Sequence, residues 1–393
     1  MHQRLNSKQM LYVRQFLFPS FLLLPLLCLS ALYLAEQSGK YNLYAWWPLF
    51  IYVIILPVVD HILGIDSANH TDDRAKKVEK DRYYRILVLI CIPIVLILTV
   101  WGAYIFSTVQ SLNWGGRIGW LFSIALCNAS LVMTAAHELI HKDSRMERLF
   151  GSFLLAFACN SGFKIEHIRG HHRLVATPTD TSSAQMDQSY YHFLMRAYKG
   201  TYLNSWFMEQ QRLSRRGYSA LNWRNELIWL HFLTLGFASA FYLVFGILGV
   251  IFFIGQSWIT LAAQQMANYT QHYGLKRLKL NENQYERFSP AHAWCCNFLL
   301  SNMLSFHLPR HTDHHIRPRR RYQVLCHIEE SPQMPTGYMG MFLMALIPPL
   351  WYRVMNPRIL AYGQDSIFEL PAENNCTGKD SNRQRVKASC EKH

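Results

Sequence analysis

The sequence predicts an all-α membrane protein, a bundle of six membrane-spanning helices with a histidine-rich cap on its cytoplasmic side. Three observations support this fold class. The composition is 51% hydrophobic and only 16% charged, which is typical of a membrane protein. Six apolar runs each approach the roughly 20 residues that a bilayer requires. Half of the 18 histidines fall into four clusters, and each cluster follows the fourth or the sixth run.

The six predicted spans form three hairpins. The first run follows basic residues and resembles a signal peptide, but it is long enough to span and no convincing small-residue cleavage site follows it. The last two runs are separated only by a glycine-bounded turn. The spans cover residues 16–35, 44–63, 86–109, 120–136, 228–248 and 249–266. We expect the membrane domain to extend over residues 1–362, and the polar composition of 363–393 predicts a disordered tail.

Basic residues near the span ends predict the orientation. Segment 64–85, between the second and third spans, contains six Lys or Arg residues, whereas Lys40 and Arg117 are the basic residues of the links on the opposite side. Because Lys and Arg are enriched in cytoplasmic loops, both termini and all four histidine clusters should be cytoplasmic. The net charge of +14 favours anionic lipid and acidic proteins as partners, and we expect no nucleic acid among them.

The first cluster, HELIHK, lies where the fourth span turns polar. His137 and His141 are four residues apart, so in a helix they share a face and can bind one metal ion. HExxH is also the signature of zinc proteases, in which the glutamate, here Glu138, is the general base. The motif alone therefore leaves the class of metal site open.

Three further clusters make a single structural zinc ion an insufficient explanation. In EHIRGHH, His167 and His171 repeat the four-residue spacing while His172 projects about 100° away, so one helix could serve two metals. Nine imidazoles exceed the four ligands of structural zinc and favour two metal ions. The clusters after the first contribute His167, His171, His172, His272, His311, His314 and His315.

Charged residues beside the clusters are candidates for supporting roles. A metal-bound imidazole usually donates its other N–H to a carboxylate or a carbonyl. The carboxylate candidates are Glu138, Glu166, Asp180 and Asp313. Four arginines after the last cluster could dock an acidic protein or form a basic rim facing lipid. They are Arg317, Arg319, Arg320 and Arg321.

The nine cysteines are scattered, and none of them forms a CxxC pair. This pattern argues against disulfides, an iron–sulfur centre or a built-in rubredoxin-type domain. Electrons for any redox chemistry should therefore come from a separate carrier.

The four motifs HELIHK, EHIRGHHR with its following TPTD, NYTQHYGL and RHTDHHIRPRRRYQ resemble those of the alkane 1-monooxygenase family of integral-membrane di-iron hydroxylases. The similarity covers roughly residues 57–358 and includes KVEKDRYYR, EQQRLSRRG and PTGYMGMFLMALIPPLWYRVMNP. Xylene methyl-hydroxylases are related, and fatty-acid desaturases share a looser version of the motifs.

This resemblance implies a six-helix bundle in the bacterial inner membrane with a cytoplasmic di-iron cap. It implies that electrons come from a rubredoxin and its reductase, and that one atom of O₂ enters an unactivated C–H bond. It assigns all nine clustered histidines as ligands of two iron ions. Iron is also the expected metal on chemical grounds, because redox-inert zinc cannot make the required oxidant from O₂.

Two departures from the family pattern bear on the substrate. Many alkane hydroxylases have Glu before the third-motif histidine, whereas this chain has Gln271, like the xylene methyl-hydroxylases. The fourth motif reads Leu-Pro-Arg-His where Leu-Gln-Arg-His is expected, so the approach to His311 can differ. Gln271 is a further candidate for contact with the metal ligands.

The expected substrate is a medium-chain n-alkane, hydroxylated at its terminal methyl group to a 1-alkanol. Such an apolar molecule dissolves in the bilayer and can reach a site at the mouth of a helix bundle laterally. Tyr52 lies two helical turns before Asp60 in the second span, which makes it a candidate for lining the substrate channel. An aromatic residue packed against lipid or a neighbouring helix is an equally good interpretation.

Several alternatives remain open at this stage. A methyl-group hydroxylase of alkylaromatics and a fatty-acyl desaturase or hydroxylase share the same motifs. A membrane zinc metalloprotease would use HELIHK alone and leave seven histidines without a role. A metal transporter would place ionisable residues within the bilayer, whereas these clusters follow the spans.

Overall fold

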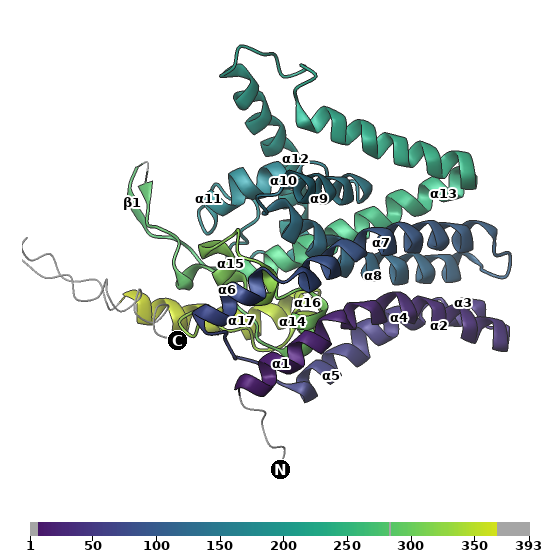
Figure 1. Cartoon of the computed structure of the whole chain (residues 1–393), viewed down its shortest axis with the longest axis horizontal. Coiled ribbons are helices and arrows are strands. Elements are labelled where there is room, and N and C mark those ends of the chain that lie inside the picture. Colours follow the sequence, from purple (N-terminus) through teal and green to yellow (C-terminus); the bar gives the residue numbers. More distant parts are fainter. Residues whose placement is uncertain (1–6, 283, 368–393) are drawn as a thin grey trace, which may run out of the picture.

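The computed structural model describes residues 7–282 and 284–367. Within these residues the chain is helical throughout except for connecting loops and one two-stranded sheet. Figure 1 shows the long helices extending side by side toward one end of the molecule, while most of the short helices and the sheet gather at the other end. We call this second region the cap.

The helices of more than ten residues are α1 (Ser7–Leu17), α2 (Leu23–Ser38), α7 (Arg82–Thr108), α8 (Trp114–Ile140), α9 (Arg145–Phe157), α12 (Tyr190–Ser214), α13 (Glu226–His272) and α17 (Pro348–Ile367). The short α-helices are α3 (Tyr41–Tyr44), α4 (Trp47–Phe50), α5 (Leu56–Leu63), α6 (Asp72–Glu79), α10 (Phe163–Glu166), α11 (His172–Leu174), α14 (Leu299–Leu304), α15 (His311–Ile316) and α16 (Tyr338–Ala345). The 3₁₀ turns are η1 (Phe18–Leu22), η4 (Pro290–His292) and η5 (Tyr322–Val324), and the π turns are η2 (Ile51–Ile55) and η3 (His167–His171). Strands β1 (Lys279–Asn281) and β2 (Gln284–Tyr285) pair antiparallel.

Five helical stretches are long and apolar enough to cross a membrane: Gln9–Ser38, Tyr41–Leu63, Arg82–Thr108, Trp114–Ile140 and Glu226–His272. The last stretch, α13, contains both of the final two predicted spans. Its helical geometry breaks at Gly246 (φ 64°, ψ −157°), and the two arms double back on one another (Figure 1). Glycine tolerates this conformation because it has no Cβ. The predicted turn between 248 and 249 therefore lies at Gly246.

Polar residues set where five long helices begin. Each of them is preceded by a side chain that accepts a hydrogen bond from a backbone N–H of the first turn, which satisfies a donor that the helix leaves unpaired. The capping residues of α7, α8, α9, α12 and α13 are Asp81, Asn113, Ser144, Ser189 and Asn225.

Helix α8 is the centre of the bundle and contacts α7, α9 and α13. Its Asn128 amide donates to Thr99 Oγ1 of α7 at 2.8 Å and to Gln256 Oε1 of α13 at 3.0 Å, so one buried side chain ties three helices together. Near the cap, Gly151 lets α9 approach α8 closely, because a Cβ there would lie 2.8 Å from Ile140 Cγ2.

Buried ionic contacts attach the first helices to the cap. Arg14 of α1 forms an ion pair with Asp66, and Arg310 Nη2 donates to the Asp66 carbonyl at 2.9 Å. Asp60 of α5 accepts from the backbone N–H of Leu300 at 2.9 Å at the start of α14. These contacts place the N-terminal helices against the segment that carries the last histidine cluster.

Helix α17 ends at Ile367, so the tail predicted from 363 overlaps the end of that helix. The rest of the predicted tail, from 368 onward, lies outside the described residues.

Candidate metal centre

All nine predicted histidines come together in the cap as two groups. In each group, one ring nitrogen per histidine lies within 4.8 Å of the corresponding nitrogens of the others. We call them the five-histidine group and the four-histidine group. The five-histidine group consists of His137, His141, His167, His172 and His314. The four-histidine group consists of His171, His272, His311 and His315.

Two apolar helices carry ligands into the cap at their C-terminal ends. His137 and His141 lie at the end of α8, and His272 is the last residue of α13. The segment α10–η3–α11 and helix α15 supply the other six histidines. Because both long helices are anchored in the bundle, the positions of these first ligands depend on the packing of the membrane-spanning region.

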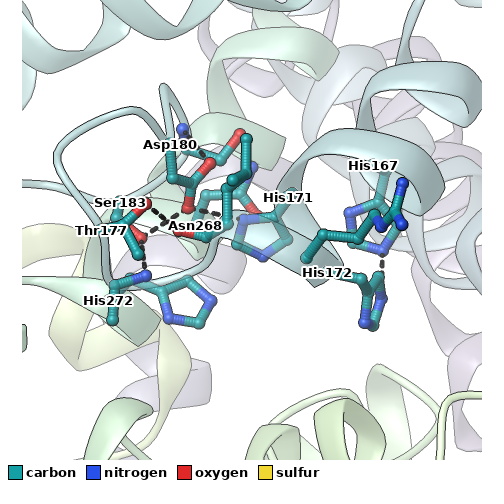
Figure 2. A network of polar contacts seen from close by, with 12 residues as sticks. His167, His171, His172, Thr177, Asp180, Ser183, Asn268 and His272 are labelled. Carbon is teal, nitrogen blue, oxygen red and sulfur yellow. Dashed lines mark hydrogen bonds and ion pairs between the residues drawn. The ribbon is translucent and has the colours of Figure 1, made fainter. Parts of the chain in front are cut away.

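A π turn decides how the second cluster divides between the groups. An α-helix would pair His167 with His171, four residues apart, as the sequence analysis assumed. The π turn at His167–His171 adds a residue to the turn, and His167 is paired with His172 instead. Figure 2 shows the His167 and His172 rings facing each other, with His171 directed to the other side. One helical segment thus contributes histidines to both groups, as predicted. The prediction paired His167 with His171, however, whereas the structure pairs His167 with His172.

The nitrogens of the five-histidine group converge on one point. His172 Nε2 lies 3.1 Å from His167 Nε2 and 3.2 Å from His314 Nε2. The Nε2 atoms of His137 and His141 are buried and lack a hydrogen-bond partner among the described residues. Buried polar atoms are normally paired, so this arrangement fits a bound cation.

The four-histidine group has the same character. His311 Nε2 lies 3.0 Å from His272 Nε2 and 2.9 Å from His315 Nε2. His171 Nε2 is buried and unpartnered among the described residues. Several imidazole nitrogens in one place, without a carboxylate among them, form a donor set suited to a transition metal.

Burial keeps most of these rings neutral, which is the form that binds a metal ion. Removal from water lowers the pKa of six histidines well below the usual value, and the neighbouring imidazoles lower it further. They are His141, His167, His172, His311, His314 and His315.

Asp180 is the predicted carboxylate that contacts a histidine of the groups. His171 Nδ1 lies 2.9 Å from Asp180 Oδ2, and both side chains are fully buried (Figure 2). Burial alone would raise the pKa of Asp180, but the charge and hydrogen bond of His171 and the donors Ser183 and Ser182 hold that pKa below its usual value. Asp180 can therefore accept the Nδ1–H of His171 and leave Nε2 free for a metal.

Two of the other predicted carboxylates contact cations instead. Glu138 forms an ion pair with Lys142 at 2.8 Å and accepts from the Tyr322 N–H at 3.4 Å. Asp313 pairs with Arg317 at 2.8 Å and with Arg320 at 3.2 Å. These two carboxylates fix the shape of the cap and do not orient an imidazole through a hydrogen bond.

Glu166 and Gln271 lie close to the groups without bonding a histidine of either group. Burial, together with the charge of Asp180, raises the pKa of Glu166 to about 7. Gln271 Nε2 donates to the phenolic oxygen of Tyr338 and, at 3.4 Å, to the Leu308 carbonyl. Gln271 thus faces the cavity described below.

An apolar cavity adjoins both groups. His137 and His167 of the five-histidine group and His311 of the four-histidine group line it. Tyr52 lies on its wall, where its hydroxyl is 2.6 Å from Ser130 Oγ of α8. The cavity is also lined by Ala129, Met133, Phe163, Ala263, Ala267, Gln271, Leu308, Tyr338, Met339 and Phe342.

The four predicted arginines are engaged in ion pairs within the cap. Arg317 and Arg320 pair with Asp313, and Arg321 pairs with the buried Glu147 at 3.1 Å. Arg319 is exposed and pairs with the equally exposed Asp143. Three of these arginines therefore have a structural role, which the sequence interpretation did not foresee.

Two aromatic rings that were not predicted from the sequence pack on proposed ligands. Phe163 stacks on His167 with ring centroids 4.7 Å apart, and Phe288 stacks on His315 at 5.0 Å. The carbonyl of His292, which lies 3.4 Å from His272 Nδ1, was not predicted either. None of these positions carries a local signal, because each acquires its role only through a contact in the folded chain.

Comparisons with known proteins identify the family of the chain. The family model described as fatty acid desaturase matches residues 112–345. The chain is 44% identical over 330 residues to alkane 1-monooxygenase 2 of Pseudomonas aeruginosa, covering 84% of this chain and 88% of the relative. It is 40% identical over 374 residues to alkane 1-monooxygenase 1 of the same organism, covering 95% and 98%.

A more distant relative is the hydroxylase component of the xylene/toluene monooxygenase of Pseudomonas putida. It is 28% identical over 257 residues, which cover 63% of this chain and 65% of the relative. The similarity to the two alkane 1-monooxygenases is higher and extends over most of both sequences. The chain therefore belongs to the alkane 1-monooxygenase family.

Proposed function

We propose that this chain is a membrane-bound, O₂-dependent hydroxylase that converts the terminal methyl group of medium-chain n-alkanes into a 1-alkanol. One observation carries the proposal. A cavity walled mainly by apolar side chains meets the two histidine groups, and histidines of both groups lie on its wall. The names of the relatives, alkane 1-monooxygenase, support the same reaction.

The chain's own residues bind the substrate and exclude water. Each CH₂ group moved from water into such a cavity contributes about 0.8 kcal/mol to binding. The wall carries the polar groups of Ser130, Thr134, Gln264, Asn268, Gln271 and Ser305, but among the described residues it has no Lys, Arg, Asp or Glu. This lining favours an uncharged, extended hydrocarbon whose end methyl faces the histidines.

We propose that the five-histidine and four-histidine groups each hold one iron ion. Bound iron would supply the reduction of O₂ and the oxidation of the C–H bond, for which zinc has no redox state. Asp180 orients His171 in this arrangement, and burial keeps most of the other rings neutral. The nine histidines are the proposed ligands.

We place the protein in the bacterial inner membrane with six crossings and with both termini and the cap in the cytoplasm. The two arms of α13, joined at Gly246, support counting that helix as two crossings. The six basic residues of segment 64–85 support the orientation.

The electrons for this reaction are proposed to come from a separate rubredoxin and its reductase. The sequence has no CxxC pair that could hold a one-iron centre of its own. The net charge of +14 favours an acidic protein as the donor.

A second candidate is the hydroxylation of methyl groups on aromatic rings. Gln271, the residue that distinguishes this chain from the alkane-hydroxylase pattern, lies on the cavity wall and donates to Tyr338. The xylene/toluene monooxygenase relative supports the same candidate. Fatty-acyl desaturation is a third reaction, in line with the name of the matching family model.

Product analysis distinguishes these candidates. Iron-loaded protein in lipid nanodiscs would be supplied with reduced rubredoxin, O₂ and, in separate reactions, octane, dodecane, hexadecane, p-xylene and a fatty acyl substrate. We expect 1-alkanols from one or more alkanes as the fastest products by gas chromatography. Faster formation of the benzylic alcohol, or of an alkene, would replace the proposed reaction with the corresponding alternative.

A further inference from the structure

The two histidine groups come closest to the protein surface at His172. His172 is partly exposed, His141 and His315 are each 9% exposed, and the other six histidines are buried. Its ring centroid lies 4.4 Å from that of His315, so the two groups adjoin at this point. Because electron transfer slows steeply with distance, a carrier that docks over His172 would reach both groups by the shortest route.

The two segments that flank the β1–β2 hairpin both contact the chain near this partly exposed histidine. In one segment, Arg277 donates its backbone N–H to the Ala176 carbonyl at 2.8 Å and its Nη1 to the Arg173 carbonyl at 3.0 Å. In the other segment, Phe288 stacks on His315 at an interplanar angle of 29°. Figure 1 shows β1 projecting from the rest of the cap. The contacts of Arg277 with Arg173 and Ala176 place the base of the hairpin next to His172.

The surface around this hairpin combines exposed apolar side chains with positive charge. Leu278, Leu280 and Ile316 are 49%, 60% and 44% exposed. The exposed basic residues on the hairpin and beside His172 are Arg173, Lys276, Lys279 and Arg287. The hairpin also carries two acidic residues: Glu282 is exposed, and Glu286 accepts from Leu278 N–H at 2.7 Å and lies 3.1 Å from His292 Nε2. The four exposed basic residues outnumber them, so the net charge of the surface is positive.

We propose that this surface, formed by Arg173, Lys276, Leu278, Lys279, Leu280, Arg287 and Ile316, is the docking site for the acidic electron carrier. The inference rests on the proposed function, which requires such a carrier. An apolar centre with a basic rim fits a small acidic protein, because the charges steer the encounter and the apolar contacts hold the complex.

The arginines after the last histidine cluster fit this role less well. Arg319 and Arg321 line a polar cleft that also holds basic residues such as Arg85 and acidic ones such as Glu79 and Asp81. Arg320 and Arg321 are tied to Asp313 and Glu147, so their charge is largely compensated. Arg319 and its partner Asp143 are both 78% exposed, and that pair carries no net charge.

Binding of purified rubredoxin to the iron-loaded protein in nanodiscs tests the surface directly. The double variant Lys276→Glu, Lys279→Glu should raise the dissociation constant about tenfold at low ionic strength, which corresponds to about 1.4 kcal/mol. The effect should shrink as salt screens the charges. Leu280→Ser should weaken binding at every salt concentration, because it removes apolar contact area.

Matched controls separate this surface from a general effect of charge. Arg145→Glu reverses an exposed charge at the start of α9, and Leu221→Ser removes an exposed leucine from the α12–α13 loop. Both should bind rubredoxin like the wild type. All variants should keep wild-type iron content and be reduced by dithionite at the wild-type rate.

The outcomes separate the two proposals. If both hairpin variants bind rubredoxin with wild-type affinity, the docking surface is wrong. It is also wrong if Arg319→Glu loses more affinity than the hairpin variants do. Neither result contradicts the proposed reaction. A wild type that binds rubredoxin through the hairpin but forms no oxidised hydrocarbon overturns the proposed reaction and leaves the docking surface in place. A wild type that does not bind rubredoxin overturns both the docking surface and the choice of carrier.

Discussion

The Nδ1 atom of His171 lies 2.9 Å from the Asp180 carboxylate, and neither side chain is exposed to solvent. This contact orients the one histidine of the π turn that belongs to the four-histidine group. Asp180 is itself held by Ser183 Oγ at 2.6 Å and by the Ser182 N–H at 3.0 Å. The proposed ligand His171 and the carboxylate that orients it, Asp180, thus belong to one continuous segment of the cap.

Asp180→Asn should lower metal affinity or turnover by roughly 10–100-fold, because such a carboxylate sets the tautomer and orientation of its imidazole. Iron content per chain and the rate of alkanol formation would be measured together. Asp143→Asn is the matched control, since that aspartate is 78% exposed and should leave both values unchanged. Equal iron content and rate in Asp180→Asn and wild type would remove Asp180 from the metal centre.

Loss of one ligand from either group should reduce iron binding. His141→Ala from the five-histidine group and His272→Ala from the four-histidine group should each lower the iron content from two ions toward one and abolish turnover. His192→Ala is the control, because that histidine is exposed on α12. Active wild-type protein that contains stoichiometric zinc and no iron would contradict the di-iron proposal.

Tyr52→Ala should shift the preferred alkane toward longer chains. The side chain lies on the cavity wall, and its removal makes room for additional CH₂ groups, each contributing about 0.8 kcal/mol of binding. Rates with octane, dodecane and hexadecane would be compared with those of Tyr33→Ala, which truncates a tyrosine that is 62% exposed on α2. An unchanged chain-length profile in Tyr52→Ala would mean that Tyr52 does not limit the channel.

Gly246→Ala should destabilise the protein by about 1–3 kcal/mol, because its backbone conformation is essentially restricted to glycine. Thermal unfolding in detergent would report the change. Gly236→Ala is the control, since that residue lies in the same helix with open space where a Cβ would be added. A Gly246→Ala variant as stable as Gly236→Ala would show that the turn between the two arms can relax.

Reporter fusions can test the proposed topology. Fusions after Lys40 and after Lys142 should report opposite sides of the membrane, because the first follows one crossing and the second follows four. Basic residues in segment 64–85 predict that Lys142 is cytoplasmic. The same side for both fusions would show that the number of crossings is wrong.

The membrane-spanning helices and the family could be predicted from the sequence. Long apolar runs end at polar caps such as Asp81 and Asn113, so most of the spanning stretches are visible as local patterns. The turn near Gly246 was predicted, although two residues too late. The alkane 1-monooxygenase family, inferred from the four motifs, is confirmed by relatives that are at least 40% identical.

The roles of charged residues could not be predicted in the same way. Glu138 and Asp313 lie next to histidines in the sequence, and Arg320 and Arg321 follow His315 by five and six residues, yet all four form ion pairs within the cap. Proximity along the chain does not reveal which direction a side chain takes. Asp180, by contrast, is nine residues from His171 and still contacts it, because the loop between them folds back.

The sequence by itself determined which nine histidines are available and that they follow the ends of apolar helices, because motif spacing and hydrophobicity are local properties. Only the tertiary structure decided how they divide into five and four. That division depends on the π turn that pairs His167 with His172, and on helix α15, which directs His314 to one group and His315 to the other. Helix packing determines the positions of the π turn and of helix α15, since segments far apart in the chain must bring their imidazoles to within 4.8 Å of one another.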